Sequence, residues 1–165
     1  MFDAAALRQV YDALLEAAAT VADSPELGRP ASGEWNADQI LAHVCLVSSA
    51  TVAAAAAVAA GEHTVYDNRI AQDIWTIDRL VDLAGGRPGL RERLRRQAEI
   101  LCGFGGSALT AAELDTLVPT RLISAGALLL DQPMPLRSLF TGLIDAEIPG
   151  HTRQLLALLP SAAGV

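Results

Sequence analysis

The chain has 165 residues, of which 52% are hydrophobic, so it can bury one sizeable core but is too short for two ordinary domains. Its net charge of -7 argues against a polyanionic partner, because phosphate recognition needs a positive field. We therefore predict one domain over residues 1–165 that does not bind nucleic acid.

Apolar residues recur at helical spacing from Ala4 to about Val21 and predict a first amphipathic helix. A loop rich in glycine and proline follows and leads to Asn36, a suitable N-cap residue with Gln39 at the capping-box position. A second helix is predicted from there to about Gly61.

The second predicted helix also has the length of a membrane span. The segment Ile40–Ala60 contains no Asp, Glu, Lys or Arg. However, its many alanines add little insertion energy, His43 lies within it, and its flanks are acidic (Glu34, Asp38, Glu62). This composition favours the central helix of a soluble protein over a membrane span.

The middle of the chain predicts two further helices, over Asp67–Ala84 and from about Leu90 to Cys102. A capping box at 110–113 opens a short helix that Pro119 is expected to close. Apolar residues on either side of 124–126 predict either a small hairpin or an extended crossover before the last helix.

Pro135 is well placed to start the last helix. Glu147 and His151 fall on its apolar face, four residues apart. No sustained period-two pattern and no internal repeat interrupt the helical periodicity. The predicted fold class is therefore all-α: an up-and-down bundle with short extra helices and a small hairpin as one option before the last helix.

Three ligand-type side chains point to one core. Glu147 and His151 lie one above the other on the last helix, and His43 lies on the apolar second helix. A carboxylate among leucines needs a partner or a cation, and a divalent metal would satisfy all three groups, leaving one coordination position open. The alternatives are a core His43 bonded to a carbonyl and a Glu147 paired with Arg153 or His151.

Pro149 lies between the two ligands of the last helix. It removes an amide that would bond to the Asp145 carbonyl and disfavours helical geometry at Ile148. The resulting bend would either open the ligand cluster towards a substrate or separate Glu147 from His151.

Other chemistry-bearing residues have ordinary interpretations. Cys45 and Cys102 lack CxxC spacing, and no secretory leader is evident, which predicts buried free thiols in a reducing cytoplasm. Three residues after the second helix are either ordinary turn residues or part of a loop over the bundle mouth that supplies substrate contacts or a proton donor: His63, Tyr66 and Asp67. Trp35 is either a core anchor or part of a pocket wall. Five arginines predict a solvated helix face or an anion site: Arg87, Arg91, Arg93, Arg95 and Arg96.

The stretch Gly33–Val44, GEWNADQILAHV, resembles the Trp-to-His entry into the second helix of the DinB-like superfamily. The stretch Glu147–Leu155, EIPGHTRQL, is similar to the last-helix signature of that superfamily, in which two ligands precede a glutamine. Many members use three histidines. A glutamate in the middle position resembles the mycothiol-dependent maleylpyruvate isomerase branch and related thiol S-transferases.

The resemblance implies a four-helix bundle with His43, Glu147 and His151 as metal ligands. Zinc is the expected metal, with nickel as an alternative. The bound metal would activate mycothiol or another low-molecular-weight thiol for transfer to a small electrophile. The alternatives are a non-catalytic bundle that binds a metal or small ligand, and a metal-free dimerisation module. A cytoplasmic homodimer is expected in either case.

Overall fold

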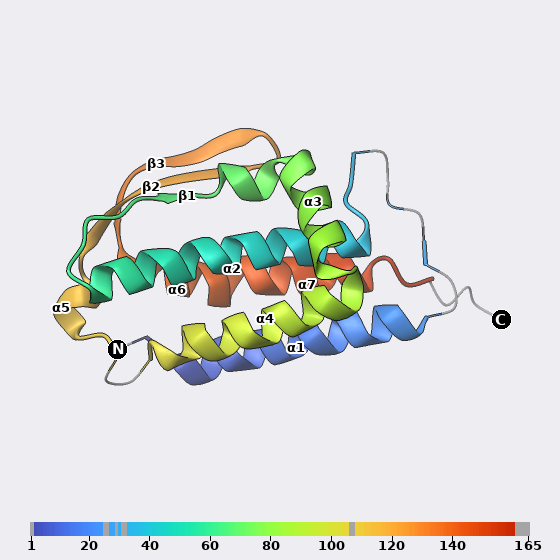
Figure 1. Ribbon diagram of the computed structural model, residues 1–165, viewed down its shortest axis with the longest axis horizontal. Helices are drawn as coiled ribbons and strands as arrows, with labels where there is room; N and C mark the ends of the chain where they lie inside the picture. The colour runs from blue at the N-terminus through green and yellow to red at the C-terminus, as the bar shows by residue number, and fades with distance from the viewer. Residues whose placement is uncertain (1, 25–26, 29, 31–32, 106–107, 161–165) are drawn as a thin grey trace.

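Long helices that lie side by side form the main layer of the molecule (Figure 1). The computed structural model describes residues 2–24, 27–28, 30, 33–105 and 108–160. The last helical stretch joins an α-helix, a π-helical turn and a second α-helix. The layer consists of α1 (Ala4–Asp23), α2 (Ala37–Ala59), α4 (Arg87–Gly103) and the stretch α6 (Leu136–Gly142), η2 (Leu143–Glu147) and α7 (Ile148–Leu156).

A three-stranded sheet, among the described residues, lies across α2 from α1 and α4 (Figure 1). β1 (Tyr66–Asp67) pairs in parallel with β2 (Leu117–Ser124), which pairs antiparallel with β3 (Ala127–Pro135). The hairpin option is therefore confirmed, but the molecule is mainly helical rather than all-α. Ala125 and Gly126 form its turn with φ values of 49° and 76°, the left-handed conformation that two-residue hairpins favour.

The third predicted helix begins later than expected. Residues 67–72 belong to β1 and to the 3-10 turn η1 (Arg69–Gln72), and α3 runs only over Ile74–Ala84. Asn68 explains the difference, because its side chain exchanges two hydrogen bonds with the backbone of Ile123 in β2, at 2.8 and 2.9 Å. The short helix α5 (Ala111–Leu114) also ends before Pro119, which lies in β2.

The predicted cap of α2 is confirmed. The Asn36 side chain accepts from the Gln39 amide at 3.0 Å, and the Gln39 side chain accepts from the Asn36 amide at 3.1 Å. This capping box satisfies two backbone donors at the N-terminal end of α2. His43 lies about two turns further along the same helix.

We expect Asn36→Ala to lower the free energy of unfolding by about 1 kcal/mol, because both reciprocal bonds are lost. Urea denaturation of the metal-free protein measures the change. Asn36→Asp, which keeps an acceptor at the same position, should lose much less. Equal stability of the wild type and Asn36→Ala would show that the cap contributes nothing.

The apolar helix α2 is long and apolar enough to cross a membrane by length and composition, as the sequence suggested. However, 61% of its most apolar window is buried inside the molecule, as in the core helix of a soluble protein. Within it, Ser48 is satisfied by the Tyr11 hydroxyl at 2.6 Å, and Thr51 donates to the Val47 carbonyl.

The core is formed where α1, α2, α4 and the last helical stretch (α6, η2 and α7) meet, and most of its residues are aliphatic. Phe2 and Phe140 add a stacked aromatic pair with centroids 4.0 Å apart. Cys45 and Cys102 are buried free thiols, as predicted, and burial raises the pKa of Cys45 to about 12. The largest fully buried side chains include Leu7, Tyr11, Leu14, Ile40, Leu41, Leu90, Leu94, Leu101 and Phe140.

Candidate metal centre

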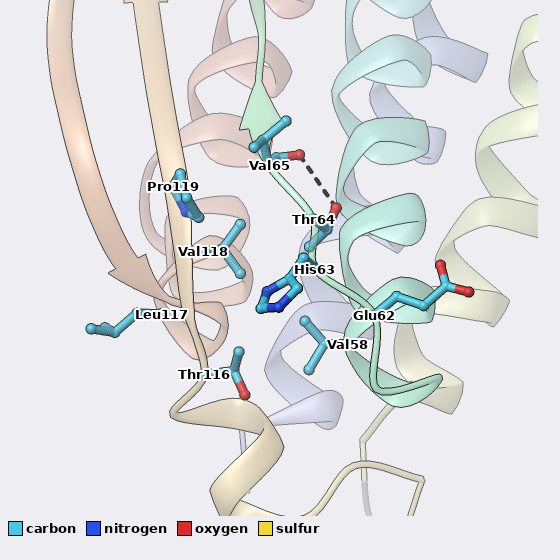
Figure 2. Close-up of a pocket in the computed structure, with 9 residues that line it drawn as sticks. All are labelled: Val58, Glu62, His63, Thr64, Val65, Thr116, Leu117, Val118 and Pro119. Carbon is cyan, nitrogen blue, oxygen red and sulfur yellow. Dashed lines mark hydrogen bonds between the residues drawn. The ribbon is translucent and has the colours of Figure 1, made fainter.

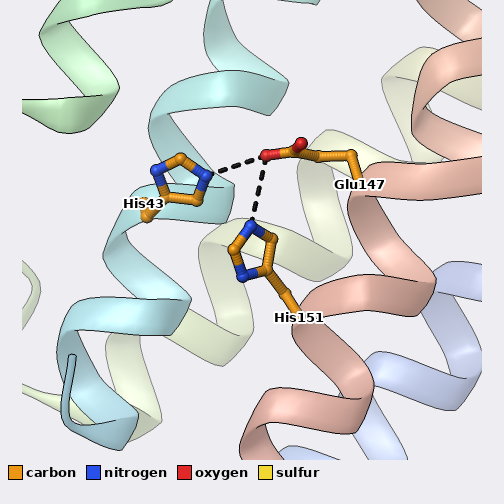
Figure 3. A group of neighbouring side chains, drawn as sticks. All are labelled: His43, Glu147 and His151. Carbon is orange, nitrogen blue, oxygen red and sulfur yellow. Dashed lines mark hydrogen bonds and ion pairs between the residues drawn. The ribbon is translucent and has the colours of Figure 1, made fainter. Parts of the chain in front are cut away.

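The structure brings the three predicted ligands together. His43 extends from α2, Glu147 from the end of η2 and His151 from α7, and one carboxylate oxygen of Glu147 faces both histidine rings (Figure 3). One ligand atom from each residue can be chosen so that all three lie within 4.8 Å of one another. His43 is only 2% exposed, whereas the other two are partly buried. This group could hold a metal ion.

The helix continues through Pro149 because of a π-helical turn. The Ile148 amide donates to the Leu143 carbonyl five residues back, and Ile148 keeps helical dihedrals of -66° and -46°. Pro149 then occupies the first turn of α7, where a missing amide is tolerated. The ligands are not separated: His151 Nε2 lies 3.3 Å from Glu147 Oε1.

The Nδ1 nitrogen of each histidine lies within hydrogen-bond distance of an oxygen acceptor. His43 Nδ1 lies 2.6 Å from the Ala71 carbonyl oxygen, which can only accept, so this nitrogen carries the proton. His151 Nδ1 lies 2.9 Å from Gln154 Oε1. The Gln154 amide is oriented in turn because its nitrogen donates to a Glu34 carboxylate oxygen at 3.3 Å. Both histidines are thereby fixed with Nε2 directed to Glu147.

A neutral histidine that carries its proton on Nδ1 presents the lone pair of its Nε2 atom to the Glu147 carboxylate. His43 Nε2 lies 2.8 Å from Glu147 Oε1, and the same oxygen is 3.3 Å from His151 Nε2. Two acceptors repel at such distances unless a proton or a metal cation lies between them. The geometry therefore defines a place for positive charge at the centre of the group.

Glu147 is held ionised. Burial by itself would raise its pKa, but when the two histidines are protonated their Nε2 groups donate to the carboxylate and their positive charge attracts it, and these effects outweigh burial and hold the pKa at about 2. The carboxylate is therefore available as an anionic ligand throughout the physiological pH range.

The separations between the ligand atoms are compatible with a tetrahedral metal. Metal–ligand bonds of about 2.0–2.1 Å place neighbouring ligand atoms roughly 3.3 Å apart. Two separations in this group are 2.8 and 3.3 Å, and the third does not exceed 4.8 Å. Two imidazoles and one carboxylate suit zinc and also nickel, and they leave a position for a further ligand. The residues present therefore fit a divalent metal.

A cavity of about 650 Å³ opens beside the three ligands. Trp35 forms part of its wall, with its ring centroid 4.6 Å from that of His43 and 6.3 Å from that of His151. Trp35 is thus both packed against the core and part of the pocket wall, which joins the two interpretations of this residue. On the other side, the cavity is bounded by the β2–β3 hairpin, including Leu122 and Leu129.

His63 does not join the metal group. It points into a second pocket of about 560 Å³ between the end of α2 and the start of β2, near Thr116 and Val118 (Figure 2). The helix from His43 to Ala59 alone spans about 24 Å. His63 therefore does not contact the candidate ligand group.

Tyr66 is buried and Asp67 is ion-paired, so both side chains are engaged within the fold. Burial raises the pKa of Tyr66 to about 12, and Asp67 is paired with Arg69. Several residues of the arginine-rich stretch make ion pairs: Arg95 and Arg96 with Glu92, and Arg87 with Asp38. These pairs favour the interpretation of a solvated helix face.

Sequence reasoning missed the groups that orient the ligands. The Ala71 carbonyl comes from η1, and a backbone group leaves no mark in the sequence. Gln154 does leave a signal, because it lies three residues after His151 and therefore on the same side of α7. Glu34 was noted only as an acidic flank of α2, whereas it fixes the Gln154 amide.

No family model matches this chain, and no curated protein or solved structure is detectably similar to it. We therefore infer a function from the residues and their geometry, together with the two motifs that resemble the DinB-like superfamily.

We expect Gln154→Leu to weaken metal binding by roughly 10–100-fold, because the His151 ring loses the acceptor that fixes its orientation. A competition titration with a chromophoric chelator measures the affinity. Gln9→Leu, an exposed glutamine on α1, is the matched control and should bind like the wild type. Unchanged affinity in Gln154→Leu would contradict an orienting role.

Proposed function

We propose that this chain is a DinB-like four-helix-bundle metalloprotein that uses His43, Glu147 and His151 to hold a divalent metal, zinc in the first instance. The observation that carries the proposal is the convergence of both Nε2 atoms on one carboxylate oxygen at 2.8 and 3.3 Å. Their Nδ1 atoms are already bonded elsewhere, which supports a metal site over an ordinary core hydrogen-bond cluster.

The reaction we propose is transfer of a low-molecular-weight thiol, such as mycothiol, to a small electrophile, or a thiol-assisted isomerisation. When bound, a divalent metal would stabilise the thiolate over the thiol at neutral pH. In a transfer, the sulfur forms a bond to the electrophilic carbon, the thiol proton passes to solvent, and the leaving group departs with the electron pair of its broken bond. In an isomerisation, the thiol adds across a carbon–carbon double bond, the remaining single bond rotates, and elimination of the same thiol with its proton restores the double bond.

The protein's own residues would position the reactants. Trp35 would cover one side of the ligand group, because its ring lies against that of His43. The hairpin residues Leu122 and Leu129 bound the cavity on the other side and would exclude water from the reacting sulfur. Cys45 is buried in the core, and burial raises its pKa to about 12, so it is unsuited to act as the nucleophile.

A binding function without turnover is the second candidate, and one observation favours it. Asn68 lines the cavity, but both ends of its amide are bonded to the Ile123 backbone, so it is not free to assist catalysis. The chain would then bind a metal or a small ligand as a cytoplasmic protein, alone or as a homodimer.

Conjugation of a thiol to 1-chloro-2,4-dinitrobenzene distinguishes the proposed enzyme from a binding protein without turnover. We expect metal-loaded protein to catalyse thioether formation with release of chloride, and the activity to disappear on chelation and in His43→Ala. His63→Ala, the histidine at the far pocket, should keep the activity. A protein that binds metal but gives no turnover with a panel of thiols and electrophiles would support the binding function.

A further inference from the structure

The wall of the cavity beside the metal group is apolar where the hairpin forms it. Leu122 pairs with Leu130, and Ile123 pairs with Leu128, which leaves Leu129 as an extra residue in β3. Such a bulge redirects a side chain, and bulges are common beside functional sites. Leu129 lines the cavity although it is 67% exposed, so a ligand with an apolar body would cover it.

The formal charges on the described wall of the cavity are acidic. Among the described residues that line it, none is an arginine, and the formally charged ones are Glu34 and Glu147. The chain has no lysine at all. Once a divalent metal has taken up Glu147 and one anionic donor, its charge is cancelled, and Glu34 leaves the cavity net negative.

The remaining polar side chains that line the cavity are uncharged, and some of them already make hydrogen bonds within the protein. Asn68 is bonded to the Ile123 backbone, and Gln154 is bonded to Glu34 and His151. Ser124 and Gln72 also line the cavity. Such groups can accept and donate hydrogen bonds to hydroxyl and amide groups, but they do not compensate a second anionic charge.

We propose that this cavity selects ligands that offer a single anionic donor on an otherwise uncharged, partly apolar body, and that it rejects ligands with a further carboxylate or phosphate. The inference rests on the proposed metal site and narrows the class of thiol and electrophile that it takes. The volume of about 650 Å³ lies within the range of small-molecule sites, roughly 300–1,000 Å³.

Paired ligands added to cobalt(II)-loaded protein test the inference by the change in cobalt absorption. Benzyl mercaptan should bind about tenfold more tightly than 4-(mercaptomethyl)benzoic acid, and benzohydroxamic acid about tenfold more tightly than its 4-carboxy derivative. In Leu129→Lys, the ratio of the affinity for the uncharged ligand to that for its carboxylated partner should fall at least threefold in both pairs. Leu128→Lys is the matched control, because Leu128 is 59% exposed on the same strand but does not line the cavity, and it should leave the ratios unchanged.

Equal or tighter binding of the carboxylated partners would overturn the inference, and so would a failure of all four ligands to bind. The two donor types separate it from the proposed function. If hydroxamates follow the charge rule while neither thiol binds, the thiol chemistry fails and the selectivity of the cavity stands. If thiols bind and react without regard to charge, the proposed function stands and the selectivity fails.

Discussion

Replacing His43 by alanine should lower the affinity for zinc by more than the roughly 100-fold that loss of an orienting partner costs, because a direct ligand is removed. His43 is also the ligand that comes from a different helix, so the remaining pair lies on the last helical stretch alone. Competition titration against a chromophoric chelator provides the measurement.

His63→Ala is the matched control for this experiment, because it removes an exposed histidine that lines a different pocket. It should bind zinc like the wild type. Similar losses in both variants would mean that the affinity comes from nonspecific histidine binding rather than from the candidate centre.

The second large effect is stabilisation of the fold by metal. At a free metal concentration about 1,000 times the dissociation constant, binding to the folded state alone adds about 4 kcal/mol. For a domain of this size, that gain corresponds to a rise in Tm of roughly 8–16 °C. Thermal unfolding with and without zinc measures it.

Glu147→Gln should abolish most of this metal-dependent rise, since the amide has nearly the same shape but lacks the anionic charge. Asp145→Asn makes the same chemical change at an exposed residue of the same turn and should retain the full rise. A zinc-dependent rise that persists unchanged in Glu147→Gln would place the metal elsewhere.

The helices and the ligand group could be predicted because their signals are local. The spacing of Glu147 and His151 fixes their relative position on a helix, and the Asn36–Gln39 box marks where the helix carrying His43 begins. The bend expected at Pro149 does not separate the two ligands, because a π-helical turn precedes the proline. That turn depends on how α6 and α7 pack and has no simple sequence pattern.

The surroundings of the centre could not be predicted, because they arise from contacts between distant segments. The sequence predicts that residues 67–72 open the third helix, yet pairing of Tyr66 with Thr120 and of Asp67 with Arg121 draws the start of this segment to the sheet. That pairing places the Ala71 carbonyl on the His43 ring. The position of Leu129 follows from a bulge in the β2–β3 register, which the alternation of residues did not reveal.

Metal content of the purified protein, determined by elemental analysis after expression and after reconstitution with zinc or nickel, tests the central claim most directly. We predict about one equivalent per chain, retained through gel filtration and lost from both His43→Ala and Glu147→Gln. A folded wild-type protein that holds no metal after reconstitution would contradict the account, and the three side chains would then form only a hydrogen-bonded cluster in the core.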